Sequence, residues 1–191
     1  MPRKTDAVAP GSQSHWKIPF TWSTDVAAEG AEHLVEGMTW AAASNEQLQP
    51  LLSRVLAASL DAADTDAVAQ VGADAAAVEL LESVADWGCS YQPEWWRILS
   101  DEQGPAGFVL PVLYLDGHRD GRADSTIFHL GVSPDRRGQG LASVLLGSAV
   151  TSLTECGVWR IYCDTDVDNA PMIRTFERCG WTRGMPREVP I

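Results

Sequence analysis

The chain has 191 residues, 45% of them hydrophobic, and a formal net charge of −12. This length predicts one domain with an ordinary core, and the acidic balance without a basic stripe argues against nucleic-acid binding. No run of 18 apolar residues occurs, so we expect no membrane-spanning helix. The four cysteines are scattered without a C-x-x-C pair, so we expect neither a metal site nor disulfides, and we predict a cytoplasmic protein.

The N-terminal segment predicts a tail followed by two strands. Residues 1–14 are polar and are expected to be a disordered tail ahead of a single domain over 15–191. His15–Trp22 predicts a strand extension at a sheet edge, because Pro19 cannot donate a ladder hydrogen bond. His33–Ala42 predicts the second strand.

Helical patterns come next. Ser44 and Gln47 form a capping box before apolar residues at helical spacing, which predicts a helix over about 45–60. The Ala- and Asp-rich segment Asp61–Asp74 is expected to be a loop, and Ala75–Trp87 a second helix.

Three antiparallel strands are predicted in the middle of the chain, over Trp95–Ser100, Gly107–Leu115 and Thr126–Val132. Pro111 interrupts the second of these strands, which indicates a bulge or an edge position there.

The most informative segment is 132–142, which reads VSPDRRGQGLA. A strand runs into a proline turn, an Arg/Gly loop and then the start of a helix. The first helical turn has N–H groups without backbone partners, and the helix dipole adds positive charge at the same end. Gly138 and Gly140 permit positive φ and a close approach to the backbone. The segment therefore predicts a phosphate or pyrophosphate site.

The spacing distinguishes between phosphate-binding loops. A P-loop needs a lysine that is missing here, and a dinucleotide fingerprint needs a third glycine where Ser143 stands. The pattern that fits is Arg-x-x-Gly-x-Ala, formed by Arg137, Gly140 and Ala142 after a Leu-Gly-Val strand. This pattern resembles motif A of the GNAT superfamily, the N-acyltransferases that use acetyl-CoA.

The C-terminal third agrees with the resemblance. Apolar spacing predicts a helix over 140–156, then a strand over Val158–Asp164, and a last helix capped by Asp168 and closed by Gly180. The resemblance is specific over about 124–181 and rests on element order upstream. It implies an α/β fold with a mixed central sheet of about six to seven strands and about four flanking helices.

The C-terminus departs from the family, which adds a long two-stranded hairpin after the position of Trp181. Only Thr182–Ile191 remain here, so the final strand should be short or absent. We expect the N-terminal arm around Trp16–Trp22, or a partner chain in a homodimer, to cover that edge.

The resemblance implies a set of residues that contact acetyl-CoA. The strand before the loop should lie along the pantetheine, with an N–H at or near Val132 polarising the thioester carbonyl. The loop amides should wrap the pyrophosphate. Asn169 matches a pantetheine-contacting position, although a helix cap is an equal alternative for it. The cofactor set is Leu130, Gly131, Val132, Arg137, Gly138, Gln139, Gly140, Leu141, Ala142, Ser143, Asn169 and Phe176.

The acid–base residues are less defined. Many family members carry a tyrosine at the position of Phe176 that protonates the leaving thiolate, so this role is vacant here or filled by water. Asp164 is the first candidate base, provided that burial raises its pKa; solvation at a strand end is the alternative. His129 is the second candidate. Strand alternation sets His129 on the face opposite Phe128, Leu130 and Val132, where it would pack against helices.

The predicted function is transfer of an acetyl group to a primary amine, either a small metabolite or a protein N-terminus or lysine, by direct attack in a ternary complex. The alternative is a non-catalytic acyl-CoA-binding module of the same fold. Residues 1–133 carry the whole net charge of −12 and residues 134–191 carry none. An acidic acceptor side would attract a cationic amine, although a biased genomic composition explains the same numbers.

Overall fold

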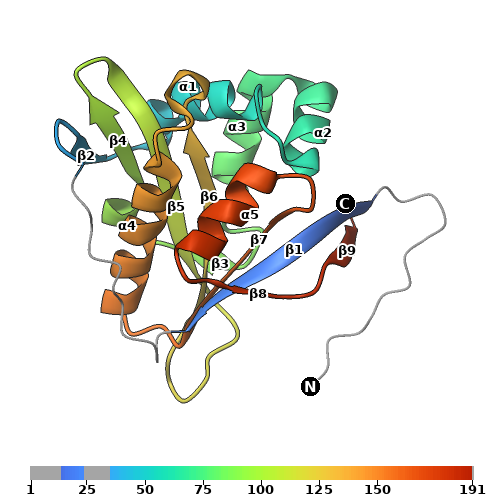
Figure 1. Ribbon diagram of the computed structural model, residues 1–191. Helices are drawn as coiled ribbons and strands as arrows, with labels where there is room; N and C mark the ends of the chain where they lie inside the picture. The colour runs from blue at the N-terminus through green and yellow to red at the C-terminus, as the bar shows by residue number, and fades with distance from the viewer. Residues whose placement is uncertain (1–13, 24–34, 191) are drawn as a thin grey trace.

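The computed structural model describes residues 14–23 and 35–190. Within them the chain forms a mixed sheet flanked by five helices (Figure 1). The helices are α1 (Asn45–Leu56), α2 (Ala62–Val71), α3 (Ala73–Glu82), α4 (Leu141–Glu155) and α5 (Ala170–Arg178). The strands are β1 (Ser14–Ser23), β2 (Thr39–Ala42), β3 (Cys89–Ser90), β4 (Arg97–Asp101), β5 (Gly104–Tyr114), β6 (Asp124–Val132), β7 (Arg160–Asp166), β8 (Thr182–Arg183) and β9 (Arg187–Pro190).

The strand order is β2-β4-β5-β6-β7-β1-β8, with β3 beside β5 and β9 beside β1. The pairs are antiparallel except for β6 and β7, which are parallel and are joined by α4. The mixed α/β fold predicted from the sequence is confirmed, with nine strands and five helices among the described residues in place of about six to seven and about four.

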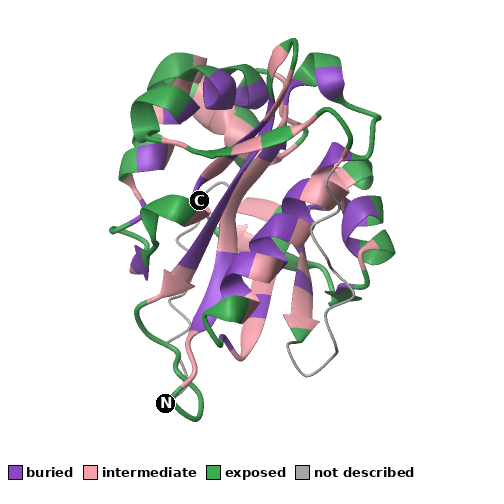
Figure 2. Ribbon diagram, turned by 90° about the vertical axis from the view of Figure 1, so that its left-hand side faces the viewer, coloured by how far each residue is buried: buried purple, intermediate pink, exposed green. Residues whose placement is uncertain are grey.

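The two faces of the sheet carry separate cores. On one face α1 and α3 pack on Phe108, Leu110 and Val112 of β5. On the other face α4 and α5 pack on β1, β5 and β7. Buried residues follow the strands and the helix sides that face them, while the outward helix faces are exposed (Figure 2).

The N-terminal strand β1 lies inside the sheet rather than at its edge. It pairs with β7 along Lys17–Ser23 and, on its other side, with the short strands β8 and β9. Phe20 of β1 is fully buried and stacks on Phe176, with ring centroids 4.6 Å apart. The expectation that this arm covers the edge left by a short C-terminus agrees with the pairing, whereas the predicted edge position of the strand is wrong.

The segment Asp61–Asp74, predicted as a loop, is largely helical as α2. The Asp61 carboxylate accepts a hydrogen bond from the Ala63 N–H and caps the helix, and alanine is a strong helix former. None of the α2 residues is buried, so the apolar periodicity that reveals α1 is missing from this helix.

Smaller differences occur at the ends of elements. β1 begins at Ser14, which was placed in the tail; the remainder of that predicted tail lies outside the described residues. The second strand covers only Thr39–Ala42, and residues 33–34 of its predicted range lie outside the described part of the chain. β7 extends to Asp166, so Asp164 lies within the strand.

Candidate active site

A cavity of about 1460 Å³ opens between β6 and β7. The two strands pair through only two positions, Asp124 with Arg160 and Ser125 with Ile161, and then diverge. Residues from the diverging parts of both strands line the cavity. The unpaired edge of β6 therefore presents backbone N–H and C=O groups to this space.

The N-terminus of α4 forms an anion cradle at the rim of the cavity. Gly138 and Gly140 have φ of 78° and 79°, and a Cβ at either position would meet no atom within 4 Å. Among the described residues, the N–H groups of 138–142 donate to no backbone carbonyl. Free amides, open space and a helix N-terminus are the features that a phosphate group needs.

The two arginines of the loop have different roles. Arg136 is buried and binds both carboxylate oxygens of Asp101, at 2.7 and 3.1 Å. Arg137 is exposed and donates to the Ala58 carbonyl at 2.8 Å and the Val132 carbonyl at 3.3 Å. Arg136 thus fixes the loop to β4, and Arg137 joins it to the end of α1.

The structure brings the predicted cofactor residues together. Ten of them line the cavity, namely Leu130, Gly131, Val132, Arg137, Gly138, Gly140, Leu141, Ala142, Asn169 and Phe176. Gln139 and Ser143 are not among the lining residues. Their contact with acetyl-CoA, like that of the other ten, stays a prediction.

The backbone of β6 supports the predicted role of Val132. The Ser133 N–H donates to the Ala106 carbonyl, so the Val132 N–H, one residue earlier, points away from β5 toward the cavity. Gly131 is required for a different reason. A Cβ there would lie 2.5 Å from Val55 of α1 and 2.9 Å from Phe108.

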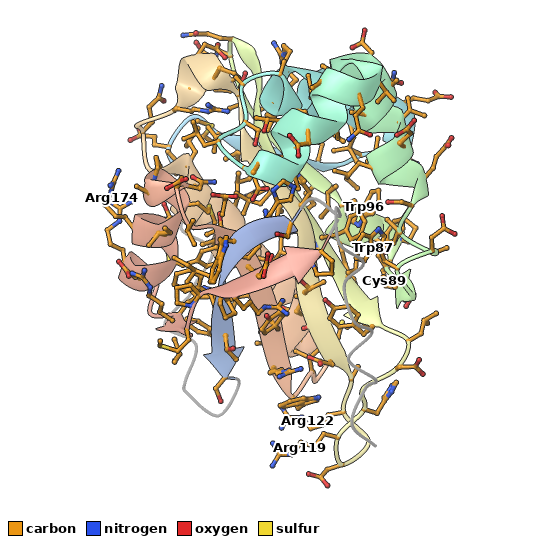
Figure 3. All side chains as sticks on the ribbon, turned by 90° about the vertical axis from the view of Figure 1, so that its right-hand side faces the viewer. Trp87, Cys89, Trp96, Arg119, Arg122 and Arg174 are labelled. Carbon is orange, nitrogen blue, oxygen red and sulfur yellow. The ribbon has the colours of Figure 1, made fainter. Side chains whose placement is uncertain are left out.

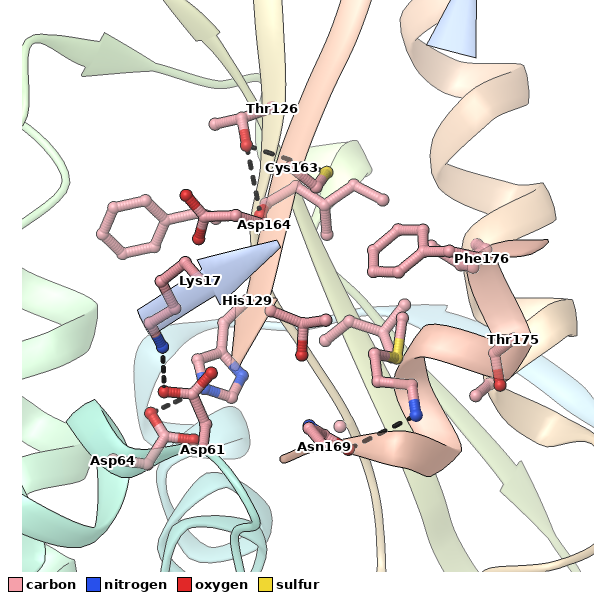
Figure 4. A pocket seen from close by; sticks show the side chains of 18 of the residues that line it. Lys17, Asp61, Asp64, Thr126, His129, Cys163, Asp164, Asn169, Thr175 and Phe176 are labelled. Atoms are coloured by element: carbon pink, nitrogen blue, oxygen red, sulfur yellow. Dashed lines mark hydrogen bonds and ion pairs between the residues drawn. The ribbon is translucent and has the colours of Figure 1, made fainter. Parts of the chain in front are cut away.

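Helix α5 places Asn169 and Phe176 on the opposite side of the cavity from Lys17 and His129 (Figure 4). Asn169 is the N-cap of α5, because its Oδ1 accepts from the Met172 N–H at 3.3 Å; the prediction of Asp168 as this cap is wrong. The helix-cap alternative for Asn169 is therefore present, and the residue also lines the cavity.

A β-bulge corrects the predicted facing of β6. The register with β5 shifts between Leu110 and Pro111, where Leu110 faces His129 and Pro111 faces Ile127. The extra residue, Phe128, packs against the α1–α3 core, while Leu130 and Val132 pack toward α4. Phe128 therefore does not share a face with Leu130 and Val132; the bulge that Pro111 indicated is the reason.

His129 lines the cavity in contact with Asp64 of α2, with 3.3 Å between Nε2 and Oδ1. Both side chains are only 15% exposed. Burial acts to lower the pKa of His129, but the Asp64 carboxylate outweighs it and raises that pKa above 6.5. Burial acts to raise the pKa of Asp64, and His129 brings it below 3.8.

Sequence reasoning missed Asp64 because the segment was taken as a loop. One available signal was Asp61, an N-cap residue ahead of an alanine-rich run. Asp61 also forms an ion pair with the buried Lys17 of β1. These two pairs hold α2 against the sheet beside the cavity (Figure 4).

Asp164 lines the cavity from β7, but its surroundings differ from the burial that a base role required. The residue is exposed, and its Oδ2 lies 3.0 Å from Nη2 of Arg187 in β9. Its role as base stays a prediction.

Two tyrosines line the cavity without the family spacing. Burial raises the pKa of Tyr114 to about 12 and also raises the pKa of Tyr162, so both phenols keep their protons at neutral pH. Phe176 is buried, stacks on Phe20 and meets Trp181 edge-on, which fits a packing role.

The described part of the chain offers neither a metal cluster nor a membrane-spanning helix. No group of three His, Cys, Asp or Glu residues there is arranged to hold a metal ion. None of the described helices is long and apolar enough to cross a bilayer. The four cysteines are free thiols, and Figure 3 labels the side chain of Cys89.

The chain matches the Acetyltransferase (GNAT) family over residues 67–181, which is more than half of its length. The chain therefore belongs to this family of acetyltransferases, as the motif at 137–142 indicated.

Curated relatives include two mycothiol acetyltransferases, from Arthrobacter sp. (strain FB24) and Pseudarthrobacter chlorophenolicus. They are 29% and 28% identical over 99 residues, which cover 46% of this chain and 31% of each relative. The chain thus spans about a third of the curated relatives that it matches.

Solved structures agree on the fold. A tandem GNAT protein from the clavulanic acid biosynthesis pathway has a TM-score of 0.61 at 15% identity, covering 94% of this chain and 54% of its own. The NatC complex bound to Gag peptide and CoA has a TM-score of 0.54 at 17% identity, covering 81% and 98%.

Proposed function

We propose that the protein transfers an acetyl group from acetyl-CoA to a primary amine by direct attack in a ternary complex. One observation carries this proposal. The free amides at the N-terminus of α4, the unpaired edge of β6 and a buried acid–base pair all border the same cavity. A binding module for acyl-CoA needs the first two features but not the third.

The residues present fit acetyl-CoA. The amides of 138–142 would hold the pyrophosphate, with open space above both glycines, and the edge of β6 at 130–132 would bind the pantetheine. Acetyl-CoA supplies an activated thioester. The Val132 N–H would stabilise negative charge that develops on its carbonyl oxygen. Asp164 is the base predicted from the sequence, with Arg187 beside one of its oxygens.

The acidic excess of the chain bears on the choice of acceptor. Asp61, Asp64 and Asp164 line the cavity, but they are paired with Lys17, His129 and Arg187, respectively. Residues 1–133 hold the whole net charge of −12, and that excess would attract an ammonium group by long-range steering. The curated relatives are named for acetyl transfer. We propose a primary amine as acceptor, with a small molecule and a protein N-terminus or lysine as the two forms to test.

Gly140→Asp tests the cradle. The substitution puts a carboxylate among the phosphate-binding amides, and we expect it to reduce thiol release from acetyl-CoA to background with every amine tried. The matched control is Gly157→Asp. Gly157 has a similar φ of 70° with no atom within 4 Å of a Cβ, but it lies at the other end of α4. The Gly157→Asp variant should therefore still release thiol from acetyl-CoA. If both variants lose thiol release equally, backbone strain explains the loss, and the assignment of the phosphate site to 138–142 is contradicted.

A further inference from the structure

The docking of α2 beside the bulge in β6 creates a contact between two segments far apart in the sequence. Without the extra residue in the strand, His129 and Phe128 would alternate as the sequence predicts. With it, both side chains lie on the face that α2 covers, and Asp64 approaches His129. Lys17 and Asp61 form the neighbouring pair (Figure 4), and the Phe108 ring stacks on the imidazole with centroids 5.7 Å apart.

We propose that His129 is the base that takes the proton of the acceptor ammonium, and that Asp64 is a positioning residue that orients the imidazole. This inference rests on the proposed N-acetyltransferase function. It assigns the proton acceptor to the α2 side of the cavity in place of Asp164.

The contact defines which nitrogen would act. Asp64 faces Nε2, so the neutral ring carries its hydrogen on Nε2 and its lone pair on Nδ1. Nδ1 is buried and has no hydrogen-bond partner in the described part of the chain. A buried nitrogen without a partner is costly in a purely structural histidine. An ammonium, or one water that bridges to it, would supply that partner once acceptor binding moves aside the side chains that cover Nδ1.

Two protons leave the ammonium nitrogen during the transfer. One proton of the ammonium moves to Nδ1 of His129, and the freed lone pair attacks the thioester carbonyl carbon. The C–N bond forms and the C–S bond breaks. The second surplus proton on nitrogen passes to the leaving sulfur, which gives free thiol, and His129 then releases its proton to solvent. Asp64 stabilises the imidazolium while it exists.

The charges that face His129 come from two elements besides its own strand. Asp64 lies in α2 and Asp61 at the N-cap of α2, and both favour the imidazolium. Lys17 of β1 opposes it, although Lys17 is itself paired with Asp61. If the reaction needs neutral His129, the rate of the wild type rises with pH as the imidazole loses its proton. This rise is the acidic limb of the pH–rate profile, and it should lie above pH 6.5.

The test compares His129→Gln, Asp64→Asn, Asp164→Asn and the control Asp66→Asn. Asp66 is on the same helix and lies 3.5 Å from His15, without contact to His129. Acetyl-CoA affinity is measured first, as a check that each variant is folded and binds. Thiol release is then followed from pH 5.5 to 9 with glucosamine, tyramine, lysine and a tetrapeptide with a free N-terminus. The fastest of these amines is used for all variants.

We expect His129→Gln to lower kcat about 100-fold or more at unchanged acetyl-CoA affinity and to remove the acidic limb. Asp64→Asn should move that limb to lower pH, because the neutral imidazole is then favoured. A merely structural Asp64 would lower activity without moving the limb. Asp66→Asn should leave the limb in place.

The experiment separates a failure of the proposed function from a failure of the His129 assignment. A wild type that releases no thiol with any probe amine contradicts the proposed function itself. A wild type that turns over while His129→Gln keeps its kcat and acidic limb contradicts the inference alone. Loss of the limb in Asp164→Asn but not in His129→Gln would identify Asp164 as the base and overturn the inference.

Discussion

Single residues decide the chemistry of the cavity, and the sequence reveals some of them better than others. The sequence indicated that Gly138 and Gly140 permit positive φ, and both residues adopt it. Asp64 escaped prediction because its partner His129 is 65 positions away in the chain. Spacing within a motif reports local backbone geometry, whereas a contact between a helix and a distant strand depends on the packed fold.

The His129–Asp64 pair predicts a pH-dependent stability. The raised pKa of His129 contributes stability that is complete below pH 6.5 and is lost as pH rises through the raised value. The lowered pKa of Asp64 contributes above pH 3.8 and is lost at lower pH. Asp64→Asn should therefore cost more in unfolding free energy at pH 5.5, where His129 is charged, than at pH 8.5.

Urea unfolding of the wild type and Asp64→Asn at the two pH values gives this difference. An equal destabilisation at both would show that the charge on His129 does not contribute to folding. Asp66→Asn serves again as the comparison on the same helix.

Whole elements were predictable where their apolar residues repeat regularly. The segments that became α1, α4 and α5 carry a capping signal or an apolar face, and their existence was predicted. Helix α2 was not, because none of its residues is fully buried: Ala67 and Val68 pack on the core only in part, and ion pairs join the helix to β1 and β6. Polar docking leaves no periodicity in the sequence.

Strand β1 pairs with β7 on one side and with β8 and β9 on the other, which gives it a large share of the core. Phe20→Ala removes a fully buried ring stacked on Phe176 and should cost about 3–5 kcal/mol of unfolding free energy. Trp16→Ala on the same strand is the control, because that side chain is 53% exposed and should change stability by less than about 1 kcal/mol. Chemical denaturation measures both. Similar small losses would show that β1 is not integral to the fold.

One part of the cavity is formed by residues that are close in sequence and carry the motif. The other part is formed by residues that only the folded structure brings together. The cradle, β6, α4, β7 and α5 are continuous in sequence, and their family resemblance was recognisable. The proposed acceptor side combines β1, α2, β7 and β9, which meet only in three dimensions. No short motif contains these residues, so their arrangement follows from strand order and could not be derived from spacing.

The central claim is that the cradle and the opening between β6 and β7 bind acetyl-CoA, and calorimetric titration tests it most directly. The account predicts one-to-one binding of acetyl-CoA and of CoA by the wild type and by Gly157→Asp, with binding abolished in Gly140→Asp. A folded wild-type protein that takes up neither ligand would contradict the account, and the proposed reaction and its base would fall with it.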